Sequence, residues 1–509
     1  MSGDAPHIIF IQTDQLAANV LSAYGDEISR TPHIDQLADN GIVFETAYCN
    51  YPLCAPSRFS MATGMLASRI GTYDNAAEMP ASVPTYAHYL RALGYQTCLS
   101  GKMHFVGPDQ LHGFERRLTS DIYPSDFEWT ADWDAEGFGG ATDIRMLTRS
   151  GVCARSVQID YDNEVTHRAV RDIYDVARSD DQRPVFLHVS YTHPHDPYLC
   201  LRRHWDLYDG PDIPMPRVGR PADADNDPHS LRVLRQHGLY DADVPDEVIM
   251  QARRAYYGSV SYIDDQVGQV MEALRASGLG DNAVVIFSSD HGEMLGERGL
   301  WLKKTFFDQA LRVPLIVHAP SRFKPARVRE FVSLLDLVPS LCDLASGGTW
   351  QPPVDRLDGE SWFPLIDTPE AEPRRDVLAE LLCEGILAPI FMLRRGAHKF
   401  ISSEGDPDQL YDLEADPDET NNLAGESEHA ALVAQLTAEI ARLWDSEAIS
   451  ADIRRSQKRR LFIKQALSSG VRPTWDFLPD GTDDPNWFRG GRNYNDWAFS
   501  FLPDPEETQ

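Results

Sequence analysis

The sequence predicts an α/β protein with a large mixed, mainly parallel sheet sandwiched by helices and a smaller α+β C-terminal subdomain. Short β-branched apolar segments alternate with helical patterns, the order expected when helices connect parallel strands. The 509-residue chain is long enough for a large core. A turn-rich texture begins near residue 369 and indicates a change of architecture. We therefore expect a main domain over residues 1–368, a subdomain over 369–470 and a tail over 471–509.

Charged and histidine-rich clusters follow most of the predicted strands. The clearest strands are His7–Thr13, Tyr95–Ser100, Pro184–Tyr191, Ala283–Ser289 and Val313–Ala319. The first four are followed, in order, by Asp14, by Lys102 and His104, by His193, His195 and Asp196, and by Asp290 and His291. In an open α/β sheet, ligands bind outside the carboxyl ends of the strands. We therefore expect these four clusters to converge on one crevice.

The C-terminal part contains one clear helix and one basic run. Leu432, Leu436, Ile440 and Leu443 recur at helical spacing within His429–Trp444. The run Arg454–Arg460 indicates either an anionic partner or, as we favour, a salt-bridged helix face or subunit contact. The tail is aromatic but broken by Gly and Pro, so it must lie on its own domain or on a neighbouring subunit. We expect the latter, in a homo-oligomer such as a dimer or tetramer.

Charge and cysteine usage restrict the partners and the compartment. Lys plus Arg number 47 against 78 Asp plus Glu, a net charge of -31 that repels nucleic acid and anionic lipid surfaces. The N-terminal apolar run is too short for a signal peptide or a membrane span and has no basic residues before it. The seven cysteines lack a CxxC spacing, which favours reduced thiols. We expect a cytoplasmic protein without nucleic-acid or membrane partners.

Cys54 precedes a predicted helix. Pro56 is tolerated in a first helical turn, so the helix is expected to begin near Cys54. Free amides and the helix dipole favour an anion at this end, and Arg58 adds a positive charge. The residues alone leave two interpretations of Cys54 open, a thiolate nucleophile and a small buried core residue.

The segment Cys54-Ala-Pro-Ser-Arg58, followed by Thr63-Gly64, resembles the signature of type I sulfatases of the alkaline phosphatase superfamily. The resemblance extends through "GKMH" and "DHGEMLGERGLWLKKTFF" to "LYDLEADPDETNNL". It implies an alkaline phosphatase-like fold. It also implies that a formylglycine-generating or equivalent maturation enzyme converts Cys54 to Cα-formylglycine, whose hydrate is the nucleophile.

The same resemblance implies a divalent metal ion and a set of catalytic side chains. The metal ligands would be Asp14, Gln15, the modified Cys54, Asp290 and His291. Many family members have a second Asp at the Gln15 position and an Asn at the His291 position. The resemblance implies Ca²⁺, and the histidine would also suit Mn²⁺. Arg58 and Lys102 would hold the formylglycine, and His104 would assist the second step. His193 and Lys303 would bind the sulfate and the leaving oxygen, and Asp290 would act as the base.

The region Gly101–Trp133 resembles choline sulfatases, a subgroup of this family. Trp129 would offer an aromatic face and Glu384 a carboxylate to a quaternary ammonium group, with Asn75 a polar contact near the sulfate. The chain departs from the subgroup at Asp143 and around Asn495, and we expect both to bind substrate. Asp143 could preserve cation binding by another route, and Asn495 lies where the tail of the family reaches into a neighbouring subunit's pocket.

These residues predict a sulfuric ester hydrolase that acts on a small alkyl sulfate, choline sulfate or a related ester. One alternative is a promiscuous arylsulfatase or a phosphonate monoester or phosphodiester hydrolase with the same site. A non-enzymatic alternative is a metal-binding protein in which Cys54 stays a thiol.

Overall fold

The computed structural model describes residues 5–135, 142–210, 213–479, 488, 493–499 and 501–503, and it confirms the predicted α/β fold. Its main sheet has the strand order β12-β2-β11-β9-β1-β7-β4-β5 in this part of the chain. The strands of this sheet are β1 (His7–Thr13), β2 (Ile42–Phe44), β4 (Gln96–Gly101), β5 (Arg116–Arg117), β7 (Val185–Ser190), β9 (Ala283–Ser289), β11 (Leu315–His318) and β12 (Ala326–Val328). All five predicted strands are present.

Strand β1 lies at the centre of the sheet and runs parallel to both of its neighbours, β7 and β9. Its apolar run Ile8–Ile11 is fully buried, as expected for a strand covered on both faces. Register pairs Thr13 with Ser289, so β1 and β9 end at the same level. Strand β11 is antiparallel to β9 and makes the sheet mixed.

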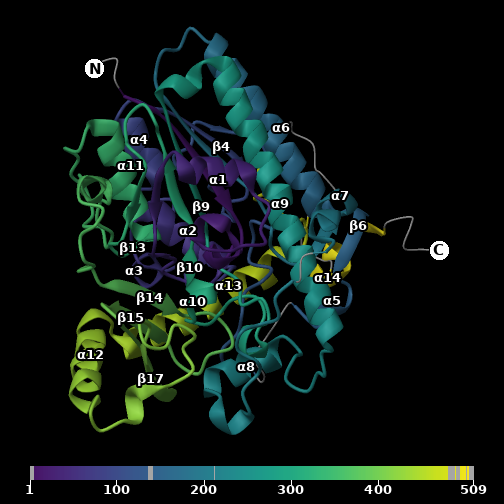
Figure 1. Ribbon diagram of the computed structural model, residues 1–509, viewed down its shortest axis with the longest axis vertical. Coiled ribbons are helices and arrows are strands. Elements are labelled where there is room, and N and C mark those ends of the chain that lie inside the picture. The colour runs from purple at the N-terminus through teal and green to yellow at the C-terminus, as the bar shows by residue number, and fades with distance from the viewer. Residues whose placement is uncertain are drawn as a thin grey trace.

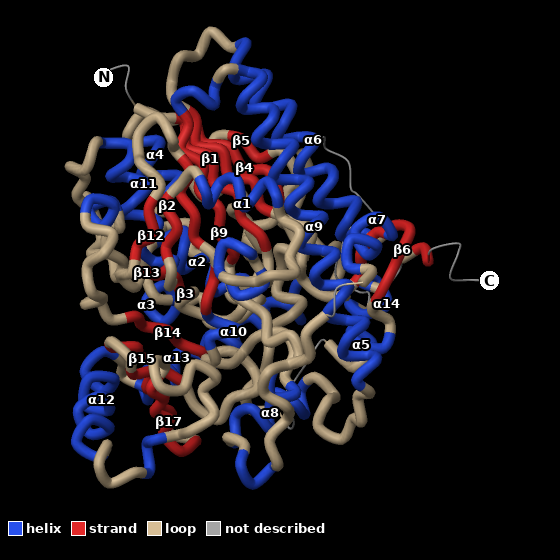
Figure 2. The backbone as a smooth tube through the Cα atoms, viewed as in Figure 1, coloured by secondary structure: helices blue, strands red, loops and turns tan. Residues whose placement is uncertain are grey.

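Helices cover both faces of this sheet (Figures 1 and 2). One face carries α1 (Pro32–Asp39), α6 (Val157–Arg178) and α9 (Asp246–Ser277). The other carries α2 (Cys54–Thr63), α4 (Tyr86–Ala92) and α11 (Leu337–Ser346). The core therefore lies on both sides of the strands, and the sheet is enclosed except where its strands end.

Shorter elements surround this core. The short helices are α3 (Ala67–Ile70), α5 (Arg145–Thr148), α7 (Arg202–Trp205), α8 (Pro228–Gln236) and α10 (Asp308–Leu311). Two small sheets have the orders β10-β3-β13 and β18-β6-β8. Their strands are β3 (Ala47–Tyr48), β6 (Gly151–Arg155), β8 (Leu199–Leu201), β10 (Arg312–Val313), β13 (Val332–Ser333) and β18 (Leu502–Pro503).

The C-terminal region forms a separate antiparallel sheet, visible at the lower left of Figure 2. Its strands, in spatial order, are β14 (Val377–Leu381), β15 (Ile390–Arg395), β16 (His398–Ser403) and β17 (Asp406–Asp412). Helix α12 (Ala430–Leu443) packs on β15 and β16 and buries Leu436 and Ile440, two of the residues at the predicted helical spacing. The exact domain boundary at residue 369 stays a prediction.

Helix α13 (Ser446–Leu467) carries the basic run and leads back across the main domain toward α14 (Tyr494–Ala498) (Figure 1). The described part of the tail packs on the same chain. Strand β18 pairs with β6, and the Tyr494 hydroxyl lies 3.3 Å from that of Tyr123. The remaining tail residues lie outside the described part, and packing on a neighbouring subunit stays a prediction.

None of the described helices is long and apolar enough to cross a membrane. All seven cysteines belong to described segments, and each is buried as a thiol.

Candidate active site

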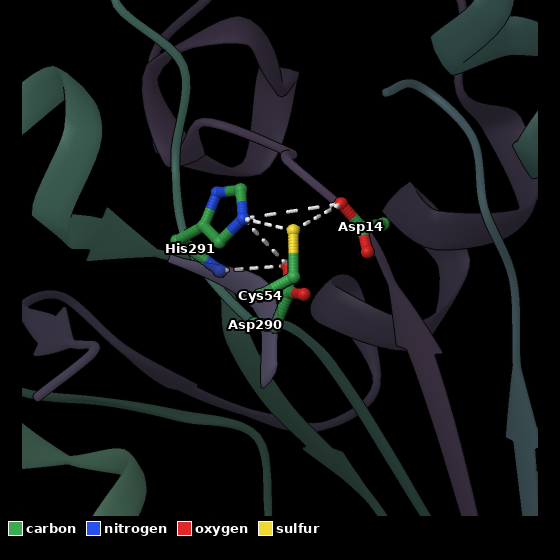
Figure 3. Close-up of side chains that lie close together, drawn as sticks. All are labelled: Asp14, Cys54, Asp290 and His291. Carbon is green, nitrogen blue, oxygen red and sulfur yellow. Dashed lines mark hydrogen bonds and ion pairs between the residues drawn. The ribbon is translucent and has the colours of Figure 1, made fainter. Parts of the chain in front are cut away.

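Four side chains meet beyond the ends of β1 and β9. Asp14 and Asp290 directly follow these two strands, and the shared register places them side by side. Figure 3 shows Asp14, Cys54, Asp290 and His291 turned toward one another. One ligand atom from each of the four lies within 4.8 Å of the others, and all four residues are buried. The predicted convergence of the strand ends therefore holds for these residues.

Helix α2 begins at Cys54, as the sequence predicts. The Asn75 side chain accepts a hydrogen bond from the Ala55 amide at 3.0 Å and so satisfies one of the open donors at the helix start. The Cys54 Sγ lies 3.2 Å from His291 Nε2 and 3.8 Å from Asp14 Oδ1. Burial and the Asp14 carboxylate raise the pKa of the Cys54 thiol to about 11. An unmodified Cys54 would therefore be a neutral thiol at physiological pH, which is a poor nucleophile.

Arg58 lies one turn after Cys54 and is fully buried. Its guanidinium pairs with Asp290 Oδ2 and Asp14 Oδ2, each at 2.8 Å. A buried guanidinium is tolerated when charged partners satisfy its donors, as the two carboxylates do here. Because each carboxylate gives its Oδ2 to Arg58, the Oδ1 atoms remain on the side of Cys54 and His291.

Lys102 reaches the Asp14 carboxylate from the end of β4. Gly101 before it has a φ of 114°, and a Cβ there would lie 1.8 Å from the Ser190 carbonyl oxygen, so only glycine permits this close approach to β7. The Lys102 Nζ lies 2.6 Å from Asp14 Oδ2. Burial alone would raise the pKa of Asp14, but Lys102 and Arg58 together hold it well below its ordinary value. Asp14 is therefore an anion.

His104 packs against two aromatic rings near the ion pair of Lys102 with Asp14. Its ring centroid is 5.0 Å from that of Tyr123 and 5.5 Å from that of Trp129. Neither ring nitrogen has a hydrogen-bond partner among the described residues. Burial and the Lys102 charge lower the pKa of His104 to about 3. His104 is therefore a neutral imidazole with an open lone pair.

The structure separates the two histidines that follow β7. His193 Nδ1 lies 2.7 Å from Asp162 Oδ2, its ring packs against Tyr262, and it is not among the residues that line the central cavity. His195 lines that cavity instead, with its Nε2 3.0 Å from the Lys303 Nζ. The sequence places both histidines after the same strand. Its position after a strand end was the only sequence signal that indicated His195. Of the two histidines, His195 is therefore the one that lies beside Lys303 in the cavity wall.

The Gln15 side chain hydrogen-bonds to Lys303 and Glu293, and its role as a metal ligand stays a prediction. Its side-chain carbonyl accepts a short hydrogen bond from Lys303, and its amide donates to Glu293 Oε2 at 2.5 Å. Glu293 Oε1 in turn accepts the backbone amides of Leu295 and Leu302. The Gln15 side chain therefore anchors Lys303, while its backbone amide donates to Asp290 Oδ1 at 3.1 Å.

The donor set of the group fits a divalent metal ion. His291 Nδ1 lies 3.0 Å from the Gly292 carbonyl oxygen, an arrangement that keeps the proton on Nδ1 and leaves the Nε2 lone pair toward Asp14 and Asp290. Two carboxylate oxygens favour a hard cation, and the imidazole shifts the preference toward Mn²⁺ relative to Ca²⁺. Asp14, Asp290, His291 and residue 54 can hold such an ion.

A cavity of about 310 Å³ opens over Cys54. We call Cys54, His195 and Lys303, which are all buried, its inner side. We call Trp129, Glu384 and Tyr494, which are all half-buried, its outer side. The remaining wall consists of Leu53, Asn75, Tyr123, Glu128, Thr130, Ala131, Thr142, Asp196, His237, Leu302 and Lys304.

The predicted substrate-binding residues divide between the cavity and its surroundings. Asn75, Trp129 and Glu384 line it, and Glu384 is paired with Lys304 at 2.5 Å. Asp143 pairs with Arg145 at 2.8 Å, and Asn495 Nδ2 lies 3.4 Å from Asp143 Oδ2. The structure therefore places Asp143 and Asn495 together, outside the cavity wall. Sequence reasoning missed Tyr123, Thr142, His237 and Tyr494, which have no motif of their own.

The chain belongs to the sulfatase family. The sulfatase family model matches residues 6–348. A second model, the C-terminal part of N-sulphoglucosamine sulphohydrolase, matches residues 296–446. The protein is therefore an enzyme, a sulfatase that hydrolyses sulfate esters.

Relatives refine this assignment. A choline-sulfatase of Rhizobium meliloti (strain 1021) is 41% identical over 490 residues, which cover 94% of each chain. An arylsulfatase of Clostridium perfringens is 28% identical over 449 residues, 83% of this chain and 91% of that one. Among solved structures, the phosphonate monoester hydrolase of Agrobacterium radiobacter has a TM-score of 0.70 at 23% identity, covering 86% of this chain and 95% of that one. This last likeness confirms the alkaline phosphatase-like fold.

Proposed function

We propose that this sulfatase hydrolyses choline sulfate or a closely related small alkyl sulfate, with Cα-formylglycine formed from Cys54. The observation that carries the proposal is the division of the cavity. Its inner side gathers Lys303 and His195 around Cys54, and its outer side presents Trp129 and Tyr494. An anionic sulfate and a cationic alcohol would each meet a complementary surface. The 41% identity to a choline-sulfatase supports this choice of alcohol.

The inner side would bind the sulfate group and prepare it for attack. A formylglycine hydrate at residue 54 would supply the nucleophilic oxygen from one hydroxyl. Its second hydroxyl would then expel the sulfate and restore the aldehyde. A divalent cation held by Asp14, Asp290, His291 and residue 54, Ca²⁺ or Mn²⁺, neutralises sulfate oxygens when bound. Arg58 fixes both Asp14 and Asp290 beside residue 54, Lys102 also holds Asp14, and we assign to Asp290 the role of the base.

Lys303 and His195 would assist the leaving oxygen. Burial alone would lower the pKa of Lys303, but the Cys54 sulfur and then the Asp14 and Asp196 carboxylates raise it. Lys303 therefore stays protonated and can donate a hydrogen bond where negative charge develops. We assign to His195 the role that the family resemblance suggested for His193, because His195 lies 3.0 Å from Lys303 in the cavity wall. The neutral His104 would accept a proton in the second step.

The outer side would bind the alcohol. A quaternary ammonium group prefers the face of a tryptophan or tyrosine ring, and Trp129 packs between Tyr123 and Tyr494 at centroid distances of 5.0 and 5.9 Å. Glu384 adds a carboxylate, although its ion pair with Lys304 offsets part of that charge. The aromatic rings would therefore contribute most of the recognition.

We further propose that the enzyme works in the cytoplasm as a homo-oligomer, after maturation by a formylglycine-generating or equivalent enzyme. Support comes from the buried thiols and from Cys54 at the head of a helix that matches the sulfatase signature.

A substrate panel with matured protein tests the proposal. We expect kcat/KM for choline sulfate to exceed that for 4-nitrophenyl sulfate, an ethyl phosphonate monoester and a phosphate diester by about two orders of magnitude, the size of several lost specific contacts. Addition of Ca²⁺ or Mn²⁺ after chelation should restore the activity. A higher kcat/KM for the phosphonate would contradict the proposal and favour the alternative activity on the same site.

A further inference from the structure

Helix α13 carries a run of basic side chains that the proposed chemistry does not use. In Figure 1 this helix crosses from the antiparallel sheet toward the main domain. Its cations are not simply solvated. Arg454 and Lys458 pair with Asp134, and Arg460 pairs with Asp74. These carboxylates belong to two segments, residues 125–135 and 74–75, and both segments border the cavity over Cys54.

The first contact area is the segment 125–135, which carries Trp129. Arg454 and Lys458 pair with the Asp134 carboxylate at 3.2 and 2.9 Å. Lys464 Nζ donates to the Glu128 carbonyl oxygen at 2.8 Å. Between these points, the buried Gln457 side chain accepts the Trp133 amide at 3.0 Å. The helix therefore holds the segment on both sides of Trp129.

The second contact area consists of Asp74 and Asn75, next to the first residues of α2. Arg460 forms two hydrogen bonds of 2.7 Å with the two oxygens of Asp74, and both side chains are buried. Asp74 Oδ1 also accepts the Ala76 amide at 2.9 Å, which shapes the turn around Asn75. Asn75 then reaches the Ala55 amide, next to Cys54. A bidentate pair of this kind fixes geometry as well as charge.

We propose that the basic run of α13 is a positioning clamp for the substrate cavity. Arg454, Lys458 and Lys464 set the position of the Trp129 segment, and Arg460 sets that of Asn75. None of these cations lines the cavity, so they act through the residues they hold. The inference rests on the proposed function only in taking Trp129 as part of the alcohol site.

The Asp134 pairs are partly exposed, so salt screens them, whereas the buried Arg460 pair is screened much less. We therefore expect KM for choline sulfate to rise with ionic strength in the wild type. This salt dependence should be smaller in a variant that lacks the Asp134 pairs.

The decisive variant is the double charge reversal Arg454→Glu with Lys458→Glu. Its matched control is Arg455→Glu, on the same helix, because Arg455 is exposed and, among the described residues, forms its salt bridge with Asp452 within α13. We expect the double variant to raise KM for choline sulfate roughly fivefold, the size of two lost surface pairs, with kcat little changed. Hydrogen exchange of the amides in 125–135 should become faster, and the control should match the wild type in both measurements.

Arg460 provides an independent test. We expect Arg460→Met to lower kcat/KM roughly tenfold and Arg460→Lys to recover part of the loss, because lysine keeps the charge but not the paired donors. If Arg460→Met does not fold, the comparison of Arg460→Lys with the wild type decides.

Hydrogen exchange needs no substrate, so it separates this proposal from the choice of alcohol. If choline sulfate is not turned over, 4-nitrophenyl sulfate supplies the kinetic readout. Unchanged exchange in 125–135 together with unchanged KM in the double variant would overturn the clamp. Equal effects from Arg455→Glu would overturn it as well.

Discussion

The two sides of the cavity are built from different parts of the molecule. The inner side and its supporting ion pairs come from the segments that follow β1, β4, β7 and β9 and from the start of α2, and Asp14, Arg58, Lys102 and Asp290 are fully buried. The outer side is assembled from the segment 125–135, the subdomain residue Glu384 and Tyr494 of the tail. Under the proposed function, the buried core would carry out the reaction and the peripheral segments would recognise the alcohol.

This difference has a physical basis. Charges in the low-dielectric core interact strongly and cannot be exchanged singly without leaving a partner unpaired. Substitution of the half-buried residues on the outer side lowers the free energy of unfolding less. Substitutions on the two sides should therefore differ in what they affect, and the following predictions use that contrast.

Loss of the inner-side nucleophile should have the largest effect. We expect Cys54→Ala to lower kcat by about four orders of magnitude or more, as is typical when a covalent nucleophile is removed. The matched control is Cys49→Ala, because Cys49 is equally buried but does not line the cavity. Steady-state rates with choline sulfate provide the measurement, and substantial turnover by the Cys54 variant would be inconsistent with the proposed chemistry.

Removing the buried cation should cost stability. Arg58→Met leaves Asp14 and Asp290 without their shared partner, and we expect the free energy of unfolding to fall by about 3–5 kcal/mol. The exposed pair of Arg145 with Asp143 beyond the outer side provides the comparison, and Arg145→Met should lower the free energy of unfolding far less. Urea unfolding of both variants measures the contrast. Equal losses would show that burial does not distinguish the two regions.

His104, between the two sides, should make stability depend on pH. Its folded-state pKa of about 3 lies below the ordinary 6.5, so between these pH values the unfolded chain binds more protons. The contribution of His104 to stability is therefore lost as pH falls from 6.5 toward 3, by about 1.4 kcal/mol per pH unit. We expect His104→Gln to flatten the decline in unfolding free energy between pH 6.5 and 5. An unchanged slope would contradict the buried, neutral histidine.

The smallest effect should come from the outer side. We expect Trp129→Ala to raise KM for choline sulfate roughly tenfold, the size of a desolvated cation–π contact, and Trp129→Phe to retain part of the affinity. KM for 4-nitrophenyl sulfate should change less, because that ester has no cation. Equal changes for both esters would mean that Trp129 has a packing role only.

The sequence predicted the inner side well, because strand ends and a helix start are local features. The strands before Asp14, Lys102 and Asp290 and the helix at Cys54 are all confirmed. It did not distinguish His193 from His195, since both follow β7 in an irregular loop and only the contact with Asp162 shows which one turns away.

The outer side was harder to predict because its residues meet only through tertiary packing. Nothing local indicates that Tyr494 reaches Tyr123. The pair of Asp143 with Arg145 is local, but the sequence did not indicate that Asp143 lies outside the cavity wall. The basic run was expected as a salt-bridged helix face or a subunit contact, and its pairs with Asp134 and Asp74 confirm the salt bridges. Which segments it would hold depends on where α13 crosses the main domain.

The central claim is that residue 54 acts as a formylglycine within a core-built sulfate site. Mass spectrometry of the peptide Tyr51–Arg58, combined with specific activity toward choline sulfate, tests it most directly. Preparations made with and without a formylglycine-generating enzyme would supply different degrees of conversion. The proposed chemistry requires activity to rise in proportion to the fraction of aldehyde and to approach zero in its absence. Full activity in protein whose Cys54 is entirely thiol would contradict it.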